Sequence, residues 1–439
     1  MHDMRQLAEL VRELDEQLKV CMRCGLCQSV CPLFAETGRE ADVARGKIAL
    51  LDGLIREMFR SPGGVDRRLS RCLLCGSCAA GCPSGVKAMD IFLRARALLT
   101  GYMGLNPLKK IIFRGLLSRP RIFDTVARWG IGLQDVFLKP ANRLPATSRG
   151  RSSFPLGERH LVRLAPKPFH REFGFVDKPG TSGVKAAFFV GCLTDKIYPE
   201  IGRAVLRSLE HDGAGIFLPD GQGCCGIPAL SSGDVESFQK LVLHNLDRFS
   251  TGSFDYLVTA CATCTATIKK VWPLFAAGFN GRDQARIAAL SEKTMDISQF
   301  MVDTMRVVAD NSTKAAGTRI LTYHDPCHLG KSLGVAAQPR KLISAHPAYS
   351  FKEMPEADRC CGFGGTFNLE HYDISSAIGK RKRDSIVSSG CETVATSCPA
   401  CMLHLSDMLS RSSDKIHVKH AIEIYADSLS GEYETPKLS

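Results

Sequence analysis

Two identical short runs of cysteine constrain this chain more than any other feature. Each run has the order Cys-x2-Cys-x2-Cys-x3-Cys-Pro. The runs consist of Cys21, Cys24, Cys27, Cys31 and Pro32, and of Cys72, Cys75, Cys78, Cys82 and Pro83. Three thiolates at this spacing can wrap one cubane iron–sulfur cluster, and the proline turns the chain so that the fourth thiolate reaches another cluster. The runs therefore predict two [4Fe–4S] clusters that share their cysteines crosswise.

The ligand sets follow from this exchange, and the pattern is similar to that of bacterial ferredoxins. We expect the first cluster to bind Cys21, Cys24, Cys27 and Cys82. We expect the second cluster to bind Cys72, Cys75, Cys78 and Cys31. A pair of zinc sites is the alternative, because Cys-x2-Cys pairs also bind zinc. Zinc sites lack the third cysteine and the trailing Cys-Pro, so the spacing favours iron–sulfur clusters.

Glycine and arginine residues accompany both runs. Gly25 and Gly76 lie between ligands, where the backbone must come close to inorganic sulfide. Arg23, Arg45 and Arg71 could offset the negative charge of the clusters, and a solvated position on the surface is the alternative for each.

The total cysteine content places the chain in a reducing compartment. The 439 residues include 19 cysteines, an odd number in a chain too large to need disulfide bonds for stability. The first twenty residues mix charges throughout and have no apolar core of the kind found in secretory signals. No apolar stretch is long enough to span a bilayer. We therefore expect a cytoplasmic protein whose cysteines are thiolates for metal.

The remaining cysteines form an internal repeat. A single cysteine, a Cys-Cys-Gly triplet and a Cys-x2-Cys pair occur twice, at offsets of 135, 136 and 137 residues. The first copy contains Cys192, Cys224, Cys225, Cys261 and Cys264, and the second contains Cys327, Cys360, Cys361, Cys398 and Cys401. Adjacent cysteines are poor disulfide partners, and a set of buried free thiols would not keep this register. The repeat therefore predicts two copies of one metal-binding module.

Apolar runs that end in cysteine or glycine indicate the fold of the repeat. Runs of strand type cover 184–192, 256–261, 319–327 and 393–398, and helical patterns follow several of them. Alternating strands and helices are typical of α/β folds with parallel sheets. We therefore expect an α/β protein that begins with a helical ferredoxin-like domain. The expected divisions are residues 1–100 for that domain, 101–182 for a basic helical or linker segment, 183–315 for the first module and 316–426 for the second.

Cys-x2-Cys pairs next to Cys-Cys-Gly triplets carry a family resemblance. The arrangement resembles the cysteine-rich (CCG) domain of heterodisulfide reductase. The whole layout resembles the iron–sulfur subunits of glycolate oxidase and of respiratory D-lactate dehydrogenases. The resemblance implies a non-cubane [4Fe–4S] cluster on the five cysteines of each module, with zinc or a simpler cluster as the alternative in one copy. In glycolate oxidase subunits the last Cys-x2-Cys pair is often incomplete, whereas both pairs are complete here.

The resemblance also implies a function. The chain has no dinucleotide-binding or phosphate-binding glycine motif, no flavin-binding segment and no nucleophile–base pair, so we expect no catalytic residue. A partner FAD subunit would oxidise glycolate or D-lactate, and this chain would pass electrons to a quinone or another carrier. The first alternative is a disulfide reductase that acts through the non-cubane clusters. The second is a binding module in which the second half holds structural zinc.

A basic middle segment indicates a surface for partners. Residues 94–171 contain 16 Lys and Arg against 3 acidic residues, which accounts for the net charge of +12. Attachment to the inner face of the cytoplasmic membrane through anionic lipid is one interpretation, and an acidic partner subunit is another. No nucleic-acid-binding fold accompanies the charge, so nucleic acid is not expected.

Four further residues lie near the metal-binding patterns without belonging to them. His324 and His328 flank Cys327, and His404 follows the last cysteine pair. We expect hydrogen-bonded structural histidines, with metal binding or proton transfer as the alternative. Cys391 fits neither pattern and is expected to be a buried core thiol.

Overall fold

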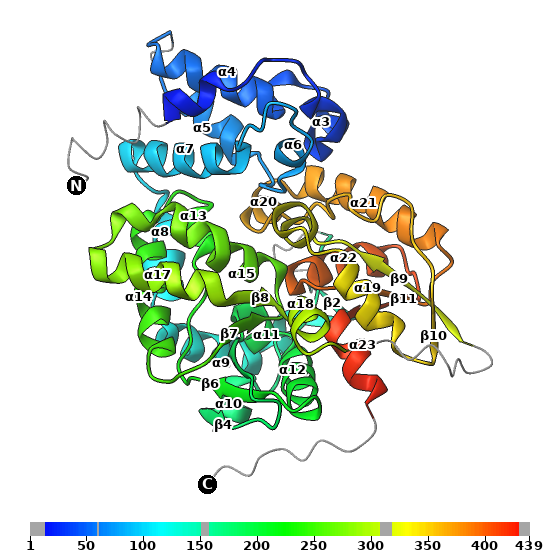
Figure 1. The fold of residues 1–439 in the computed structure, drawn as a ribbon. Helices are drawn as coiled ribbons and strands as arrows, with labels where there is room; N and C mark the ends of the chain where they lie inside the picture. Colours follow the sequence, from blue (N-terminus) through cyan, green and yellow to red (C-terminus); the bar gives the residue numbers. More distant parts are fainter. Residues whose placement is uncertain (1–13, 59–60, 151–157, 308–317, 430–439) are drawn as a thin grey trace.

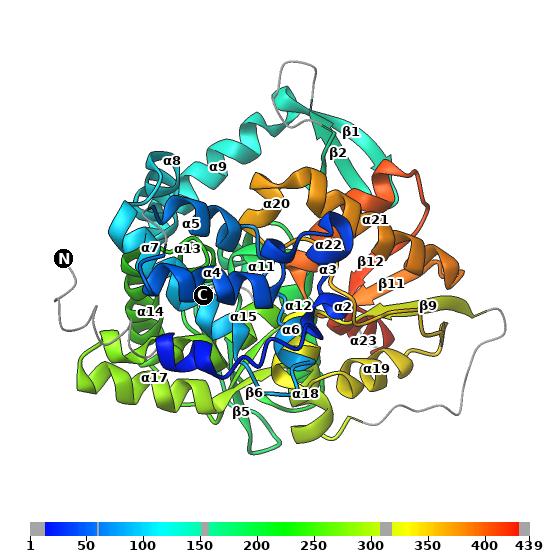
Figure 2. The ribbon, with the colours of Figure 1, turned by 90° about the horizontal axis from the view of Figure 1, so that it is seen from above.

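The computed structural model describes residues 14–58, 61–150, 158–307 and 318–429 (Figure 1). A layer of N-terminal helices lies at the top of this view, above two α/β modules that stand side by side. Figure 2 looks down on this layer and shows its helices lying across the modules. The α/β fold class predicted from the sequence is confirmed. No helix in the described part of the chain combines the length and the hydropathy needed to cross a bilayer.

The N-terminal layer consists of helices that follow or connect the two cysteine runs. These are α2 (Cys27–Val30), α3 (Pro32–Thr37), η1 (Glu40–Asp42), α4 (Ala44–Ile55), α5 (Gly63–Ser70), α6 (Ser77–Ala80) and α7 (Ala88–Met103). The sequence of residues 45–59 predicts a helix that the Ser-Pro-Gly-Gly run at 61–64 ends, and α4 corresponds to it. Apolar residues at helical spacing also predict a helix over 3–19. Most of that range falls outside the described residues, which begin in a helix at Leu14. Ile91, Ala95 and Leu99 recur every four residues along α7 and are buried in the core of this layer.

The basic middle segment combines helices with a small sheet. It contains α8 (Pro107–Lys110), the π-helix η2 (Ile111–Leu117), α9 (Pro120–Phe137), β1 (Leu138–Arg143), β2 (Ala146–Gly150) and β3 (His160–Leu161). β1, β2 and β3 form an antiparallel sheet in the stretch that resembles a linker in sequence. Asn142 Nδ2 donates to the Ser410 carbonyl at 2.6 Å, and the His160 N–H donates to Asp407 at 2.8 Å. These polar contacts with the distant helix α22 (Pro399–Arg411) hold the sheet in place. A local apolar pattern in the sequence therefore does not predict it.

The first module is built on a five-stranded sheet with the order β4-β6-β5-β7-β8. Its strands are β4 (Val176–Lys178), β5 (Lys185–Phe189), β6 (Gly215–Leu218), β7 (Tyr256–Thr259) and β8 (Thr294–Asp296), and only β4 runs antiparallel. Its helices are α10 (His170–Phe173), α11 (Cys192–Lys196), α12 (Pro199–His211), α13 (Ile227–Leu230), α14 (Val235–Phe249), α15 (Ala262–Ala266), η3 (Thr267–Val271), α16 (Trp272–Leu274), η4 (Ala276–Gly278), α17 (Gly281–Lys293), α18 (Ile297–Gln299) and η5 (Phe300–Thr304).

The second module is built on a four-stranded parallel sheet with the order β10-β9-β11-β12. Its strands are β9 (Arg319–His324), β10 (Tyr349–Phe351), β11 (Thr393–Thr396) and β12 (His417–His420). Its helices are η6 (His328–Ser332), α19 (Ala337–Ser344), α20 (Thr366–Glu370), α21 (Tyr372–Ser388), α22 (Pro399–Arg411) and α23 (Ala421–Ser428). The strand runs predicted from the sequence correspond to β5, β7, β9 and β11.

The two modules share a hydrophobic core. Phe188 and Val258 of the first sheet belong to the same buried cluster as Met402, Ile422 and Tyr425 of the second module. Because the carboxyl ends of parallel strands meet at one edge of a sheet, the cysteines that follow β5, β7, β9 and β11 gather at one edge of each module. Packing of the modules brings these two edges together.

Candidate metal centres

The eight cysteines of the N-terminal runs gather around two adjacent hollows. One hollow is lined by Cys21, Cys24, Cys27 and Cys82. The other is lined by Cys31, Cys72, Cys75 and Cys78, and Cys78 borders both. Each hollow therefore combines three cysteines of one run with the fourth cysteine of the other. Binding of a cluster by these particular thiols stays a prediction.

The backbone has the same unusual conformation in both runs. Arg23 and Gly25 have φ angles of 58° and 86°, and Leu74 and Gly76 at the matching positions have φ angles of 53° and 73°. A Cβ atom at either glycine would lie 2.7 Å from a neighbouring side chain. The positive φ angles favour glycine at both positions, where the loop turns tightly around the hollow.

Two buried cations lie beside the second hollow. Lys47 is 1 % exposed and lines it. Burial lowers the pKa of Lys47, whereas the nearby thiols of Cys72 and Cys31 favour its charged form. Arg96 is also buried and donates hydrogen bonds to the carbonyl oxygens of Leu69 at 2.5 Å and Cys72 at 2.8 Å. Sequence reasoning missed both, because nothing in a local pattern shows that a basic side chain on an amphipathic helix points inward.

Arg23, Arg45 and Arg71 are paired with carboxylates instead. Their nitrogens lie 3.2 Å from Asp52, 2.7 Å from Glu40 and 3.4 Å from Asp42, respectively. The charge of these three arginines is thus partly balanced within the protein.

All ten cysteines of the repeat line one cavity of about 730 Å³ between the modules. They are Cys192, Cys224, Cys225, Cys261, Cys264, Cys327, Cys360, Cys361, Cys398 and Cys401. The elements that carry them are far apart in sequence, so the gathering is a product of the fold. The cavity also reaches Leu73, Leu74 and Gly76 of the N-terminal layer.

Corresponding cysteines of the two copies have matching local structure. Cys261 and Cys398 immediately precede α15 and α22, so both Cys-x2-Cys pairs begin a helix. Gly226 and Gly362 follow the adjacent cysteines with φ angles of 92° and 94°. In the first copy, Cys192 Sγ lies 3.9 Å from Cys224 Sγ. Both copies of the repeat therefore have the same local backbone geometry, which directs the thiols towards the shared cavity.

Hydrogen bonds among the thiols favour the ionised form at one member of each adjacent pair. Contacts with Cys224 and Cys264 hold the pKa of the Cys225 thiol well below its usual range. Contacts with Cys360 and Cys401 lower the pKa of Cys361 in the same way. Thiolates are the metal-binding form of cysteine, so these pairs suit metal ligation.

The N-terminal layer contacts the second module through its cysteines. The Cys75 thiol interacts with that of Cys360, and both belong to one buried cluster. Beside them, Lys331 Nζ donates to Ser77 Oγ at 2.8 Å. The second hollow therefore adjoins the cysteines of the second module.

The two modules also meet through their cysteines. The thiols of Cys261 and Cys398 interact with each other. Thr263 Oγ1 lies 3.6 Å from Cys398 Sγ across the same junction. Neighbouring cysteine thiols thus connect the first hollow to the second hollow, then to the second module and finally to the first module.

The three histidines near the patterns have different environments. His328 lies 3.2 Å from Thr263 Oγ1 and 3.0 Å from the Leu74 carbonyl oxygen. His404 lies 3.2 Å from the Ser375 carbonyl oxygen, as expected for a structural histidine. His324 is fully buried and has no hydrogen-bond partner at either ring nitrogen within the described residues. Cys391 is buried, as predicted, and its thiol contacts the Ile386 carbonyl.

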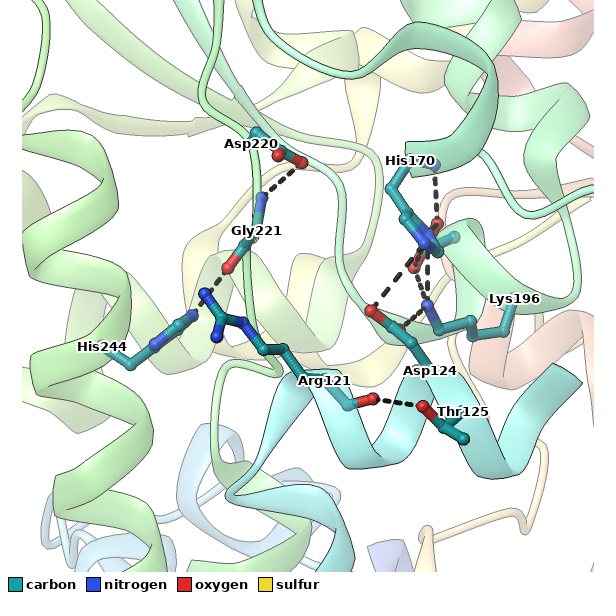
Figure 3. A network of polar contacts seen from close by, with 9 residues as sticks. Arg121, Asp124, Thr125, His170, Lys196, Asp220, Gly221 and His244 are labelled. Carbon is teal, nitrogen blue, oxygen red and sulfur yellow. Dashed lines mark hydrogen bonds and ion pairs between the residues drawn. The ribbon is translucent and has the colours of Figure 1, made fainter.

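A second cavity of about 710 Å³ borders the first module, and Figure 3 shows several of the polar residues that line it. Cys192 and Cys224 form part of its wall. On one side, Lys196 Nζ contacts Asp124, lies 2.5 Å from Asp195 and lies 3.2 Å from His170. Lys196 Nζ lies among both carboxylates and the imidazole, so these three side chains already have a partner within the protein and do not form an open metal site.

The opposite wall of this cavity carries His244, whose Nε2 lies 2.6 Å from the Gly221 carbonyl oxygen, together with Arg121. Apolar side chains such as Phe123 and Leu218 also line the cavity. The cavity therefore offers polar groups at both sides of an apolar space, a form typical of sites for small organic molecules.

Thiol chemistry and spacing fit the expected clusters. All 19 cysteines are free, and eighteen of them line the two hollows and the larger cavity. Thiolates in groups of four, held by loops with positive φ angles, are the donor set of [4Fe–4S] clusters. The fold and the site together define an iron–sulfur protein with a two-cluster N-terminal domain and a duplicated cysteine-rich module.

Comparison with known proteins gives the same class. The "4Fe-4S dicluster domain" family matches residues 17–86, and the "Cysteine-rich domain" (CCG) family matches residues 186–269 and 321–406. A fumarate reductase (CoM/CoB) subunit of Methanothermobacter marburgensis is 30% identical over 90% of this chain and 69% of its own length. The probable glycolate oxidase iron-sulfur subunit of Bacillus subtilis is 28% identical over 97% of this chain and 98% of its own length.

A shorter relative matches part of the chain. Lactate utilization protein A of an Exiguobacterium species is 32% identical over 54% of this chain and 95% of its own length. The chain belongs to this family of oxidoreductase-associated iron–sulfur subunits with tandem CCG domains, and it is an iron–sulfur electron-transfer protein.

Proposed function

We propose that the chain is the electron-transfer subunit of a flavin-dependent 2-hydroxy-acid dehydrogenase. A partner FAD subunit would oxidise glycolate or D-lactate, and a quinone or another carrier would receive the electrons. Iron–sulfur clusters, when bound, supply one-electron redox chemistry. The observation that carries the proposal is the succession of thiols, in which Cys78 borders both hollows, Cys75 contacts Cys360, and Cys398 contacts Cys261.

An exposed apolar surface supports docking of the FAD subunit at the N-terminal end of this succession. Cys24 is the one exposed thiol among the 19. Val20, Met22, Leu26 and Val30 lie close to it in sequence and are also exposed. Apolar side chains around an exposed cluster ligand suit a protein interface through which an electron can pass.

The cavity beside Cys192 and Cys224 supports an acceptor site at the other end. Its volume of about 710 Å³ falls within the range of small-molecule sites. Lys196 and His170 lie on one wall, and His244 lies on the other. A quinone needs two protons as well as two electrons, and these side chains would supply hydrogen bonds to its two carbonyl oxygens.

An exposed stripe on α9 supports contact with a membrane. Its apolar members recur at intervals of four and three residues and are Ile122, Val126, Trp129, Leu133 and Val136. Arg121 and Arg128 are exposed on the same helix. An amphipathic helix with an exposed tryptophan and nearby arginines suits the surface of an anionic bilayer. The attachment proposed for residues 94–171 would thus lie near the acceptor cavity, which also includes Ile122.

A disulfide reductase is the second candidate. The observation in its favour is that the cysteines of both modules face one shared cavity, so a disulfide could reach both metal centres. Under this candidate the purified chain reduces disulfides without a flavoprotein.

Metal analysis of anaerobically purified protein, combined with assays with and without the FAD subunit, tests these proposals. About sixteen irons per chain with negligible zinc, and reduction of the chain by glycolate or D-lactate only when the flavoprotein is present, would support electron transfer. About eight irons would mean that the modules are not redox centres, and the proposal would fail. Disulfide reduction by the chain alone would favour the second candidate.

A further inference from the structure

Equivalent positions in the two modules carry different side chains. Phe189 ends β5 and His324 ends β9, and each lies three residues before the first cysteine of its module. Phe189 is in register with Thr259 of β7, and His324 is in register with Thr396 of β11. The two residues therefore occupy the same place in the duplicated fold, one with an apolar ring and the other with an imidazole.

Burial leaves His324 without a hydrogen-bond partner. Its side chain is fully buried, and neither ring nitrogen forms a hydrogen bond with any described residue. The Ala357 carbonyl lies near enough to act on the ring, but it accepts the Asp325 N–H at 3.0 Å, and its geometry towards the imidazole falls short of a hydrogen bond. A buried polar group without a partner is costly, so another interaction must compensate.

The cysteine pair and the Cys-x2-Cys motif supply neighbours of the right chemistry. A ring nitrogen of His324, Cys361 Sγ and Cys401 Sγ all lie within 4.8 Å of one another. Ligand atoms of one zinc or iron ion lie roughly 3–4 Å apart, given metal–ligand distances of about 2.0–2.3 Å. Imidazole nitrogen and thiolate sulfur are both common ligands of these metals. A small shortening of the distances between these three atoms would allow them to bind one metal ion through both nitrogen and sulfur.

We propose that His324 is a ligand of the metal centre in the second module. The inference rests on the proposed binding of a metal centre by that module, and it means that the two modules have different donor sets. The second module offers five thiols and one imidazole, whereas Phe189 leaves the first module with thiols alone.

Unequal ligands have a consequence for the direction of electron flow. If the imidazole takes the place of one of the five thiolates at a metal ion, it raises the reduction potential of the centre, because a neutral ligand replaces an anionic one. The buried ammonium of Lys382, which donates to the Ala357 carbonyl at 3.2 Å, adds a positive charge on the same side. We therefore expect the centre of the second module to have the higher potential of the two.

Pulsed EPR of protein that contains isotopically labelled histidine tests the ligand directly. Spectra would be recorded at potentials that cover the oxidised and reduced forms of every centre. The expected result is a strongly coupled imidazole nitrogen on one centre. Absence of such coupling in protein whose metal content shows both modules loaded would overturn the ligand assignment alone. Absence of metal from the modules would overturn the assignment together with the proposed function.

His324→Phe is the matched variant, because it installs the side chain found at Phe189. We expect it to abolish the nitrogen coupling and to shift the potential of one centre downward. His404→Asn is the control, since His404 is equally buried but bonds to the protein. Unchanged spectra and potentials in His324→Phe would overturn the proposal. Should this variant fail to fold, His324→Cys provides a thiolate at the same place, and the labelled unmutated protein still decides the question.

Discussion

His328 Nε2 lies 3.0 Å from the carbonyl oxygen of Leu74, which joins the second module to the N-terminal layer. The other ring nitrogen lies 3.2 Å from Thr263 Oγ1 of the first module. The imidazole of His328, whose Nε2 donates to the Leu74 carbonyl oxygen, therefore ties together all three parts of the chain. The contact lies beside the junctions at which cysteines of different parts meet.

Removal of this imidazole should loosen the junction. We expect His328→Ala to lower the free energy of unfolding by about 1–3 kcal/mol, because two buried hydrogen bonds are lost. Thermal or denaturant unfolding under anaerobic conditions measures the change, with His211→Ala as a control at an exposed histidine. Equal losses in the two variants would contradict a joining role for His328.

Serine in place of a cluster ligand should remove metal. We expect Cys75→Ser to lose about four irons per chain, since one thiolate of the second N-terminal cluster is missing. Iron analysis and EPR of the reduced protein measure the loss. Cys391→Ser is the matched control, because this thiol is buried but lies outside both patterns. A full iron content in Cys75→Ser would refute the ligand set.

Alanine at the glycine turn that both copies share should destabilise the modules. A Cβ atom at Gly226 would lie 2.8 Å from Phe238, and one at Gly362 would lie 2.8 Å from the Ser375 carbonyl oxygen. Both residues also have positive φ angles. We expect each substitution to cost about 1–3 kcal/mol. Gly281→Ala is the control, since its Cβ would meet open space, and a cost there equal to the others would exclude this explanation.

The carboxyl group of Glu423 makes stability depend on pH. Burial raises the pKa of Glu423 to about 7. Because this folded-state pKa exceeds the value in the unfolded chain, the folded protein binds the extra proton, and stability is lost as the pH rises from about 4.5 to about 7. Glu423→Gln keeps an oxygen that can accept the His420 N–H and removes the titration.

We therefore expect Glu423→Gln to unfold at a higher temperature than the unmutated protein at pH 8, with a gain of up to about 3 kcal/mol. The difference should shrink as the pH falls towards 5. Unfolding curves at several pH values measure it, and Glu57→Gln, at an exposed carboxylate in the N-terminal layer, should show no such trend. A gain that is independent of pH would rule out titration of Glu423 as the cause.

Substitution on the exposed face of α9 should weaken contact with lipid. Trp129 is 69% exposed. We expect Trp129→Ser to reduce binding to vesicles that contain anionic phospholipid several-fold, because the indole would insert at the interface. Vesicle sedimentation measures binding, and Leu369→Ser removes another exposed apolar side chain away from α9 as a control. Equal binding by all three proteins would argue for a protein partner at this face.

The sequence by itself determined the chemistry of the protein and the elements of its modules. Cysteine spacing predicted the iron–sulfur class, the offsets predicted the duplication, and apolar runs before the cysteines predicted β5, β7, β9 and β11, because all of these signals are local or periodic. The domain divisions and the ligand sets remain predictions that metal analysis and mutagenesis can test.

Only the tertiary structure decided how these parts meet. Contacts between segments far apart in sequence bring Cys75 next to Cys360 and Cys261 next to Cys398. Such contacts also bury Lys47 and Arg96 and hold the small sheet against α22. His324 differs from His328 and His404 for the same reason. Its neighbours Cys361 and Cys401 come from other elements of the module, and no sequence pattern shows which buried imidazole is left without a hydrogen bond.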